Sequence, residues 1–263
     1  MKEYFIFMKT KISKFTAPSL DKTLPESDSS YGGLIAEIGR LFINKPYRTG
    51  TLESPGKEKL IVNVSCFDCT TFLETVLALA RCTVAGRISR HEFQKNLQSI
   101  RYRRGKIDGY SSRLHYFTDW LRDNENKNIL ADLSKSLGGK PQRKKINFMI
   151  THRELYAALK KEAQLSKMLA VEKNLSRKIS YIIEKNKISA QKSKIHNGDI
   201  IAFAAEQEGL DVAHVGFALW QGKSLRLLHA SSKEDAVVIS KNTLAAYLKS
   251  SKKFTGIIVA CPK

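Results

Sequence analysis

The hydrophobic pattern of the chain changes once, near residue 197, and this change constrains the fold more than any other feature of the sequence. Before it, apolar residues recur at helical spacing, which predicts helices at 31–43, from Cys69 onward, and at 89–101, 112–123 and 151–178. After it, short alternating runs predict strands at 200–204, 212–220, 225–230, 236–239 and 256–261, with a short helix at 242–249. This order predicts an α+β fold, in which N-terminal helices pack on a C-terminal antiparallel sheet.

Three regions differ in composition. Residues 1–30 are polar and mixed, which predicts a flexible N-terminal arm. Residues 31–263 are expected to form a single domain that carries a basic helical insertion at about 124–196. No apolar run approaches the roughly 18 residues of a membrane span, so no transmembrane segment is expected. The apolar run at residues 4–8 is too short to be read as a signal peptide.

The chain is strongly basic, with 45 Lys and Arg against 25 Asp and Glu, a formal charge of +20. The excess lies mainly in 140–145, 160–194 and 249–253, and it predicts an anionic partner. Nucleic acid, acidic lipid and the carboxylate-bearing bacterial cell wall all carry that charge, and a generally basic proteome would give the same excess. Because no RNA-binding aromatic motif or zinc-finger spacing is present, nucleic acid is not expected.

The four cysteines are too few and too unevenly spaced for a disulfide framework, so reduced thiols are expected. Cys66 and Cys69 form a C-x-x-C motif, which is compatible with a redox pair or half of a zinc site. A zinc site would require a second pair, and none is present, so no metal is expected. Cys82 and Cys261 are interpreted as small apolar core residues.

Cys69 is the candidate nucleophile because it stands at the predicted first turn of a helix. Asp68 or Thr70 can cap that helix. The positive end of the helix dipole favours a thiolate, which is the form of cysteine that attacks carbonyl groups.

A thiol nucleophile needs a base, and two of the six histidines fit this role. His214 begins a predicted strand with Gly216 on the same face, and His229 ends the next strand. With a turn centred at 221–222, the two histidines would pair directly across an antiparallel ladder, as a base and the group that orients it. Three other histidines, His91, His152 and His196, are interpreted as surface or capping residues. The sixth, His115, lies in an unusual cluster of polar and aromatic residues.

Five motifs follow one another along the chain: Asp68–Glu74, Ser112–Trp120, Gly198–Ile201, Gly209–Gly216 and Leu228–Ser232. Together they resemble the N-acetylmuramoyl-L-alanine amidase-like family, a branch of the NlpC/P60 cysteine peptidases. The resemblance runs from about residue 31 to the C-terminus. It implies a papain-like NlpC/P60 core, with Cys69 as nucleophile, His214 as general base and later acid, His229 as orienter, and no metal or other cofactor.

The implied reaction is hydrolysis of the N-acetylmuramoyl-L-alanine amide bond in peptidoglycan fragments (muropeptides), through a thioester acyl-enzyme. Two alternatives stay open: cleavage of the γ-D-glutamyl-diaminopimelate bond, and a non-catalytic basic module that binds cell wall or nucleic acid. Expected substrate-binding residues are Tyr47, Asp68, Arg113, His115, Tyr116, Asp119, Asp211 and Ser231. Residues 113–120 would also suit a helix with a buried apolar face and solvated polar neighbours.

Two further expectations concern regulation and location. Cys66 and Cys69 are close enough in sequence to form a reversible disulfide. Wall chemistry indicates the bacterial cell envelope or periplasm, whereas the lack of a readable signal peptide would fit the cytoplasm. The sequence does not predict the oligomeric state.

Overall fold

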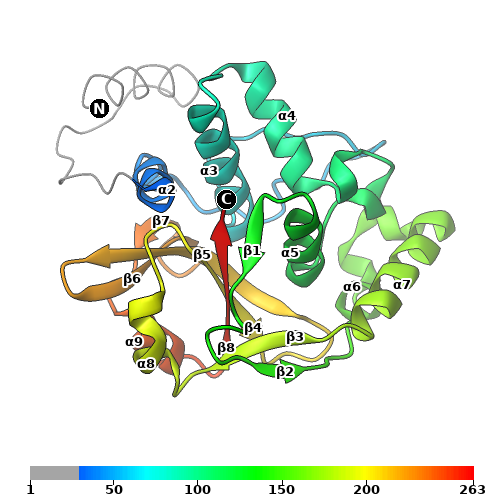
Figure 1. Cartoon of the computed structure of the whole chain (residues 1–263). Helices are drawn as coiled ribbons and strands as arrows, with labels where there is room; N and C mark the ends of the chain where they lie inside the picture. The colour runs from blue at the N-terminus through cyan, green and yellow to red at the C-terminus, as the bar shows by residue number, and fades with distance from the viewer. Residues whose placement is uncertain (1–29) are drawn as a thin grey trace.

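The structure, a computed structural model, describes residues 30–263, so the predicted arm at 1–30 lies almost wholly outside the described residues. Within them, eight antiparallel strands form one sheet of order β2-β3-β8-β4-β5-β6-β7, with β1 paired to β8 (Figure 1). The strands are β1 (Leu130–Asp132), β2 (Lys140–Gln142), β3 (Ser180–Glu184), β4 (Ile200–Ala205), β5 (Val212–Gln221), β6 (Ser224–Ser231), β7 (Ala236–Ile239) and β8 (Phe254–Pro262). The expected α+β fold with an antiparallel sheet is confirmed.

The alternation along β4 shows how the sheet is buried. Ile200 and Ala202 face a core shared with helices on one side, whereas Ile201 and Phe203 face a second core on the other side. All six residues of β4 are buried, as expected for a central strand that is covered on both faces.

Four helices contribute to the first core: α2 (Tyr31–Arg40), α3 (Cys69–Val84), α4 (Arg90–Arg101) and α5 (Phe117–Asn126). α3 packs against β5, where the rings of Phe72 and Phe217 meet edge to face at 5.9 Å. The second core includes residues from α8 (Ile188–Gln191) and α9 (Leu244–Lys249). The sheet therefore separates the helix that carries Cys69 from the short helix α9.

The helix expected at 112–123 begins only at Phe117, so that prediction was wrong at its N-terminal end. Residues 110–112 form the 3₁₀ turn η2 (Tyr110–Ser112), and Arg113 pairs with Tyr102 in an isolated bridge. An Asp211 carboxylate oxygen accepts the Thr118 N–H at 2.7 Å, which caps α5 from a distant segment. Local sequence patterns do not contain this capping interaction.

The segment before residue 197 differs from its prediction in two ways. The helix expected at 151–178 is observed only as α7 (Glu162–Ser176), and the residues before it form short turns. These are α6 (Phe148–Thr151), η3 (Arg153–Leu155) and η4 (Ala157–Lys160). In addition, β1, β2 and β3 join the sheet, although no strands were expected there. A small separate core holds α7 in place, and it includes Tyr116, Met149 and Met168.

No helix within residues 30–263 is long and apolar enough to cross a membrane.

Candidate active site

Cys69 is the first residue of α3, and its position is fixed by the cap that precedes it. Asp68 Oδ1 accepts the Thr71 N–H at 2.7 Å, and Thr71 Oγ1 accepts the Asp68 N–H at 2.9 Å. This reciprocal pair is a capping box, which satisfies backbone donors at the helix start. The Cys69 Sγ accepts backbone hydrogen bonds from Val215 in β5 and from Thr70. The predicted N-cap and the predicted helix start are both confirmed.

The two histidines meet, although in a register different from the expected one. The β5–β6 ladder pairs Phe217 with Leu228, which places Gly216 rather than His214 opposite His229. The turn lies at Gly222-Lys223, where Gly222 has a φ of 56° at the first central position. The predicted direct pairing of His214 with His229 is therefore wrong by two residues in register.

The side chains nevertheless form a hydrogen bond on the diagonal, with His214 Nε2 and His229 Nδ1 2.7 Å apart. Because this contact occupies Nε2 of His214, only Nδ1 of that ring is left for another partner. Cys69 and His214 both line a pocket of about 80 Å³, named here the Cys69 pocket. His229 lies behind it and is 1% exposed.

Burial keeps the Cys69 thiol and the imidazoles of His214 and His229 neutral near pH 7. It lowers the pKa of His214 to about 3, with a further contribution from His229, and lowers the pKa of His229 to about 4. Burial, followed by the negative charge of Asp68, raises the pKa of the Cys69 thiol to about 11. Desolvation of the thiol therefore opposes the effect of the helix dipole, which favours the thiolate.

Tyr247 in α9 is a site residue that sequence reasoning missed. Its ring centroid lies 5.4 Å from that of His229 and 6.4 Å from that of His214. Burial raises its pKa, and the charge of Cys69 adds to that effect. A tyrosine in a short helix more than 170 residues after Cys69 carries no local signal of this proximity.

Tyr47 lies beside the nucleophile. A parallel bridge joins Tyr47 to Phe67, two residues before Cys69. Burial raises the pKa of Tyr47 to about 12, and the charges of Cys69 and Asp68 act in the same direction. The Tyr47 side chain hydrogen-bonds that of Ser232.

Arg113 and His115 line a second pocket of about 520 Å³, named here the central pocket. It shares Thr70, Leu114 and His115 with the Cys69 pocket, so the two adjoin. The guanidinium of Arg113 pairs with Glu53 at 2.8 Å. Burial and the charge of Arg113 lower the pKa of His115 to about 3, which makes its ring a neutral surface of the pocket.

Tyr116 and Asp119, which were expected to bind substrate, make contacts that hold the structure together. The Tyr116 hydroxyl donates to Glu172 Oε1 at 2.6 Å and accepts the Met149 N–H at 2.9 Å, which ties α7 to the rest of the chain. Asp119 forms a two-pronged ion pair with Arg103 at 2.7 and 3.0 Å. Neither residue lines the Cys69 pocket or the central pocket.

Asp211 and Ser231 have similar supporting contacts. Asp211 lines the Cys69 pocket, but its two oxygens accept the N–H groups of Thr118 and Val212. Ser231 Oγ accepts the Glu234 N–H at 3.2 Å and so stabilises the turn after β6. Both side chains therefore position the backbone around the histidines.

The remaining cysteines are free thiols. Asn63 Nδ2 donates to Cys66 Sγ at 3.1 Å, Cys82 is buried, and Cys261 is half-buried in β8. Among the described residues, no group of three or more His, Cys, Asp or Glu side chains is arranged to hold a metal ion.

The model of a protein family, described as N-acetylmuramoyl-L-alanine amidase-like, matches residues 37–257. The chain belongs to this family. A crystal structure of an N-acetylmuramoyl-L-alanine amidase from Bacteroides uniformis is similar to it, with 39% identity and a TM-score of 0.83 over 89% of this chain and 99% of the other. A Bacteroides fragilis protein, named provisionally as a xylanase, is 42% identical with a TM-score of 0.81 over 86% of this chain and 99% of the other.

A third solved structure is more distant in sequence, and its similarity to this chain concerns the fold alone. This Legionella pneumophila protein is 23% identical, with a TM-score of 0.70 over 99% of this chain and 94% of the other. A comparison with curated proteins finds no match. The family and its structural relatives indicate a hydrolase of the amidase-like type with a peptidoglycan-related role.

Proposed function

We propose that the protein is a cysteine amidase that hydrolyses the N-acetylmuramoyl-L-alanine bond of muropeptides through a thioester acyl-enzyme. The observation that carries this proposal is the arrangement of Cys69 and His214 on one pocket, with His229 hydrogen-bonded to His214 at 2.7 Å. A nucleophile, a base and an orienting group in this order are the parts that acyl transfer requires.

The neutral state of the site determines how the first step proceeds. If His214 donates from Nε2 to His229, its Nδ1 is unprotonated and accepts the Cys69 proton as the sulfur attacks the lactyl carbonyl. The protonated His214 then gives that proton to the departing alanine amine, and the C–N bond breaks. A water molecule, deprotonated by His214, attacks the thioester and releases the muramoyl acid and the free thiol. His229 keeps the ring of His214 oriented throughout.

The oxyanion of each tetrahedral intermediate needs hydrogen-bond donors. The Cys69 N–H at the start of α3 is one proposed donor, since the start of a helix carries a partial positive charge. The Tyr47 hydroxyl, which stays protonated because its pKa is about 12, is a second proposed donor. Loss of one such donor costs about 3 kcal/mol of transition-state stabilisation in acyl-transfer enzymes.

The proposal includes a papain-like NlpC/P60 core and a location in the bacterial cell envelope. The support for the core is a helix start that carries the thiol against strands that carry the histidines. The support for the location is the amidase-like family, whose substrates are related to peptidoglycan.

The glycosidase activity that the xylanase name of one relative implies does not fit the carboxylates of this site. A glycosidase needs two carboxyl groups about 5 to 10 Å apart that are free for acid and base chemistry. In the central pocket, Asp68 caps α3, while Glu53 and Glu74 pair with arginines. In the Cys69 pocket, both oxygens of Asp211 accept backbone N–H groups. The thiol and imidazoles therefore support amide hydrolysis better than glycoside hydrolysis.

The test is product analysis by mass spectrometry after incubation with a defined disaccharide-peptide. We expect free disaccharide and intact stem peptide, no products with Cys69→Ala, and unchanged products with the matched control Cys66→Ser. Shortened peptides still attached to the sugar would establish the γ-D-glutamyl-diaminopimelate endopeptidase instead. Unchanged substrate with the wild-type protein would support a non-catalytic binding module and contradict the proposal.

A further inference from the structure

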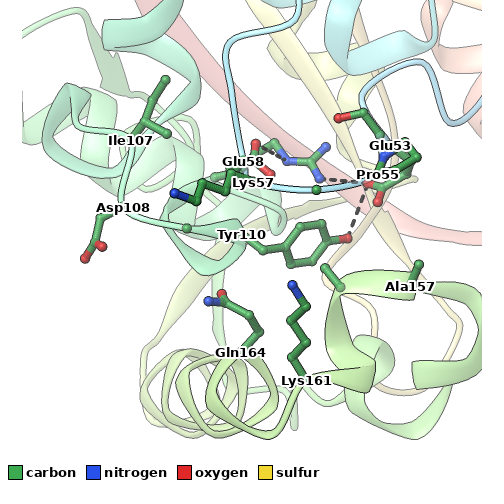
Figure 2. Close-up of a pocket in the computed structure, with 15 residues that line it drawn as sticks. Glu53, Pro55, Lys57, Glu58, Ile107, Asp108, Tyr110, Ala157, Lys161 and Gln164 are labelled. Carbon is green, nitrogen blue, oxygen red and sulfur yellow. Dashed lines mark hydrogen bonds and ion pairs between the residues drawn. The ribbon is translucent and has the colours of Figure 1, made fainter.

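The largest of the adjoining pockets is about 690 Å³ and is named here the outer pocket (Figure 2). One wall is the loop at 53–58, and the opposite wall comes from η4 and the start of α7. It shares Glu53 and Arg113 with the central pocket, which itself adjoins the Cys69 pocket. The three pockets thus form one series of adjoining sites that begins at the nucleophile, and the outer one has the size of a ligand site.

The acidic side chains of the outer pocket are already paired. Glu53 Oε1 accepts hydrogen bonds from Arg113 at 2.8 Å and from the Tyr110 hydroxyl at 3.3 Å. Glu58 lies 3.3 Å from the same guanidinium and accepts a hydrogen bond from the Tyr102 hydroxyl at 2.7 Å. Figure 2 marks the contact between Tyr110 and Glu53 with a dashed line. These two carboxylates therefore do not attract a cationic ligand.

The third carboxylate, Asp108, lies 3.8 Å from the amine of Lys167. Within residues 30–263, Lys57 and Lys161 form no ion pair, and both are exposed at the outer pocket. In Figure 2 the amine of Lys161, the residue just before α7, points towards Tyr110, and Lys57 projects from the facing loop. The charge that this pocket offers to a ligand is therefore positive, from two ammonium groups on opposite walls.

We propose that the outer pocket binds the carboxylates of the stem peptide, an inference that rests on the proposed function. The two halves of the substrate differ in charge. In a muropeptide the lactyl carboxyl of the sugar is consumed in the amide bond, so the disaccharide half is neutral. All remaining carboxylates belong to the peptide half. Lys57 and Lys161 therefore select the leaving-group side of the scissile bond, and the disaccharide lies on the opposite side of Cys69.

Gln164 adds a polar contact to this pocket. It lines the outer pocket from α7, and its Oε1 accepts the Ser111 N–H at 3.4 Å. This orients the side chain with its amide nitrogen next to Gly109, where an added Cβ would stand 3.0 Å away. The amide can donate to a peptide carbonyl or carboxylate. The segment from η4 to α7 thus provides polar contacts for a peptide in the outer pocket.

Calorimetric titration of the Cys69→Ala protein with the free tripeptide L-Ala-γ-D-Glu-diaminopimelate tests this inference without turnover. We expect binding that weakens about fivefold for each of Lys57→Gln and Lys161→Gln, which corresponds to about 1 kcal/mol for a solvent-accessible ion pair. A tripeptide with its carboxylates converted to amides should bind as weakly to the parent as the acidic tripeptide binds to the double variant.

The matched control is Lys160→Gln, because Lys160 is the sequence neighbour of Lys161 but does not line the outer pocket. It should bind the tripeptide like the parent. Equal affinity of the acidic and amidated tripeptides, or no change in the double variant, would overturn the inference. Binding by the Cys69→Ala protein together with no cleavage by the wild type would contradict the proposed reaction and leave the peptide subsite supported.

Discussion

Gly216 lies directly against His229, because a Cβ built at residue 216 would stand only 2.8 Å from the His229 Cβ. The same added atom would be 2.9 Å from the backbone oxygen of Leu228. Real Cβ atoms do not approach this closely, so glycine is required for the imidazole of His229 to reach His214. The glycine in the His-Val-Gly segment thus has a packing role in the site.

Gly216→Ala should therefore lower kcat/KM by at least about tenfold, because displacement of His229 leaves His214 without its orienting partner. The measurement is muropeptide turnover together with the free energy of unfolding. Gly222→Ala is the matched control: it is strained by a φ of 56° but meets no atom within 4 Å, so it should lose stability and keep its activity. Equal losses of activity in the two variants would argue against the packing role.

The buried histidines predict an acid-sensitive fold. Burial holds the pKa of His229 near 4, below the 6.5 of a solvated imidazole. Below about pH 6.5 the unfolded chain binds a proton at this histidine that the folded chain does not bind. The free energy of unfolding is therefore unaffected by this histidine above that pH and decreases as the pH falls towards 4. Between pH 6.5 and 5 the loss is about 2 kcal/mol.

His229→Gln should remove this contribution while keeping a polar partner for His214. Urea unfolding at about pH 7 and pH 5 should show a drop in the free energy of unfolding that is smaller in the variant by about 2 kcal/mol. His91→Gln, whose side chain is 84% exposed in the wild type, is the control and should retain the full drop. An identical pH dependence in all three proteins would exclude His229 as a source of acid sensitivity.

The sequence predicts the parts of the site that depend on local pattern. Asp68, Cys69 and the helix after them follow from a cap and a helical period, and the strands after residue 197 follow from alternation. Short strands such as β1 escape prediction because three residues cannot display a period. Its pairing with β8 depends on segments more than 120 residues apart.

Register and ionisation depend on the folded environment and were predicted less well. A hairpin turn at Gly222-Lys223 rather than at 221–222 shifts the partner of every residue in the ladder by two. The helix dipole near Cys69 is readable from sequence, but the burial that outweighs it arises when β5 packs over the thiol. The hydrogen bond by which Asp211 caps α5 also forms only in the folded chain, because the two segments are far apart in the sequence.

The ion pair between Glu74 and Arg101 is buried directly beneath the central pocket, at 2.6 Å, with side chains 2% and 3% exposed. Removing one partner leaves an uncompensated charge, so Glu74→Ala should cost about 3 to 5 kcal/mol of unfolding free energy. The double variant Glu74→Leu with Arg101→Leu should recover much of that loss. Urea unfolding measures both, and a double variant less stable than either single one would contradict this account.

The matched control for this pair is a surface ion pair of similar geometry. Lys140 and Glu184 lie 2.8 Å apart but are largely solvated. Glu184→Gln should therefore leave the unfolding transition unchanged. A large effect at this exposed pair would show that the cost at Glu74 does not come from burial.

The charge of Asp68 predicts a measurable change in Cys69 reactivity. Asp68 raises the pKa of the thiol, after the larger effect of burial, so the wild-type protein should alkylate slowly at neutral pH even when active. Asp68→Asn keeps an Oδ1 that can accept from Thr71, so α3 remains capped, but the negative charge is gone. The midpoint of the pH profile for iodoacetamide alkylation at Cys69, followed by peptide mass spectrometry, should therefore move to lower pH. Asp108→Asn, which removes a distant exposed carboxylate, should not move it, and an unchanged or higher midpoint in Asp68→Asn would contradict this electrostatic coupling.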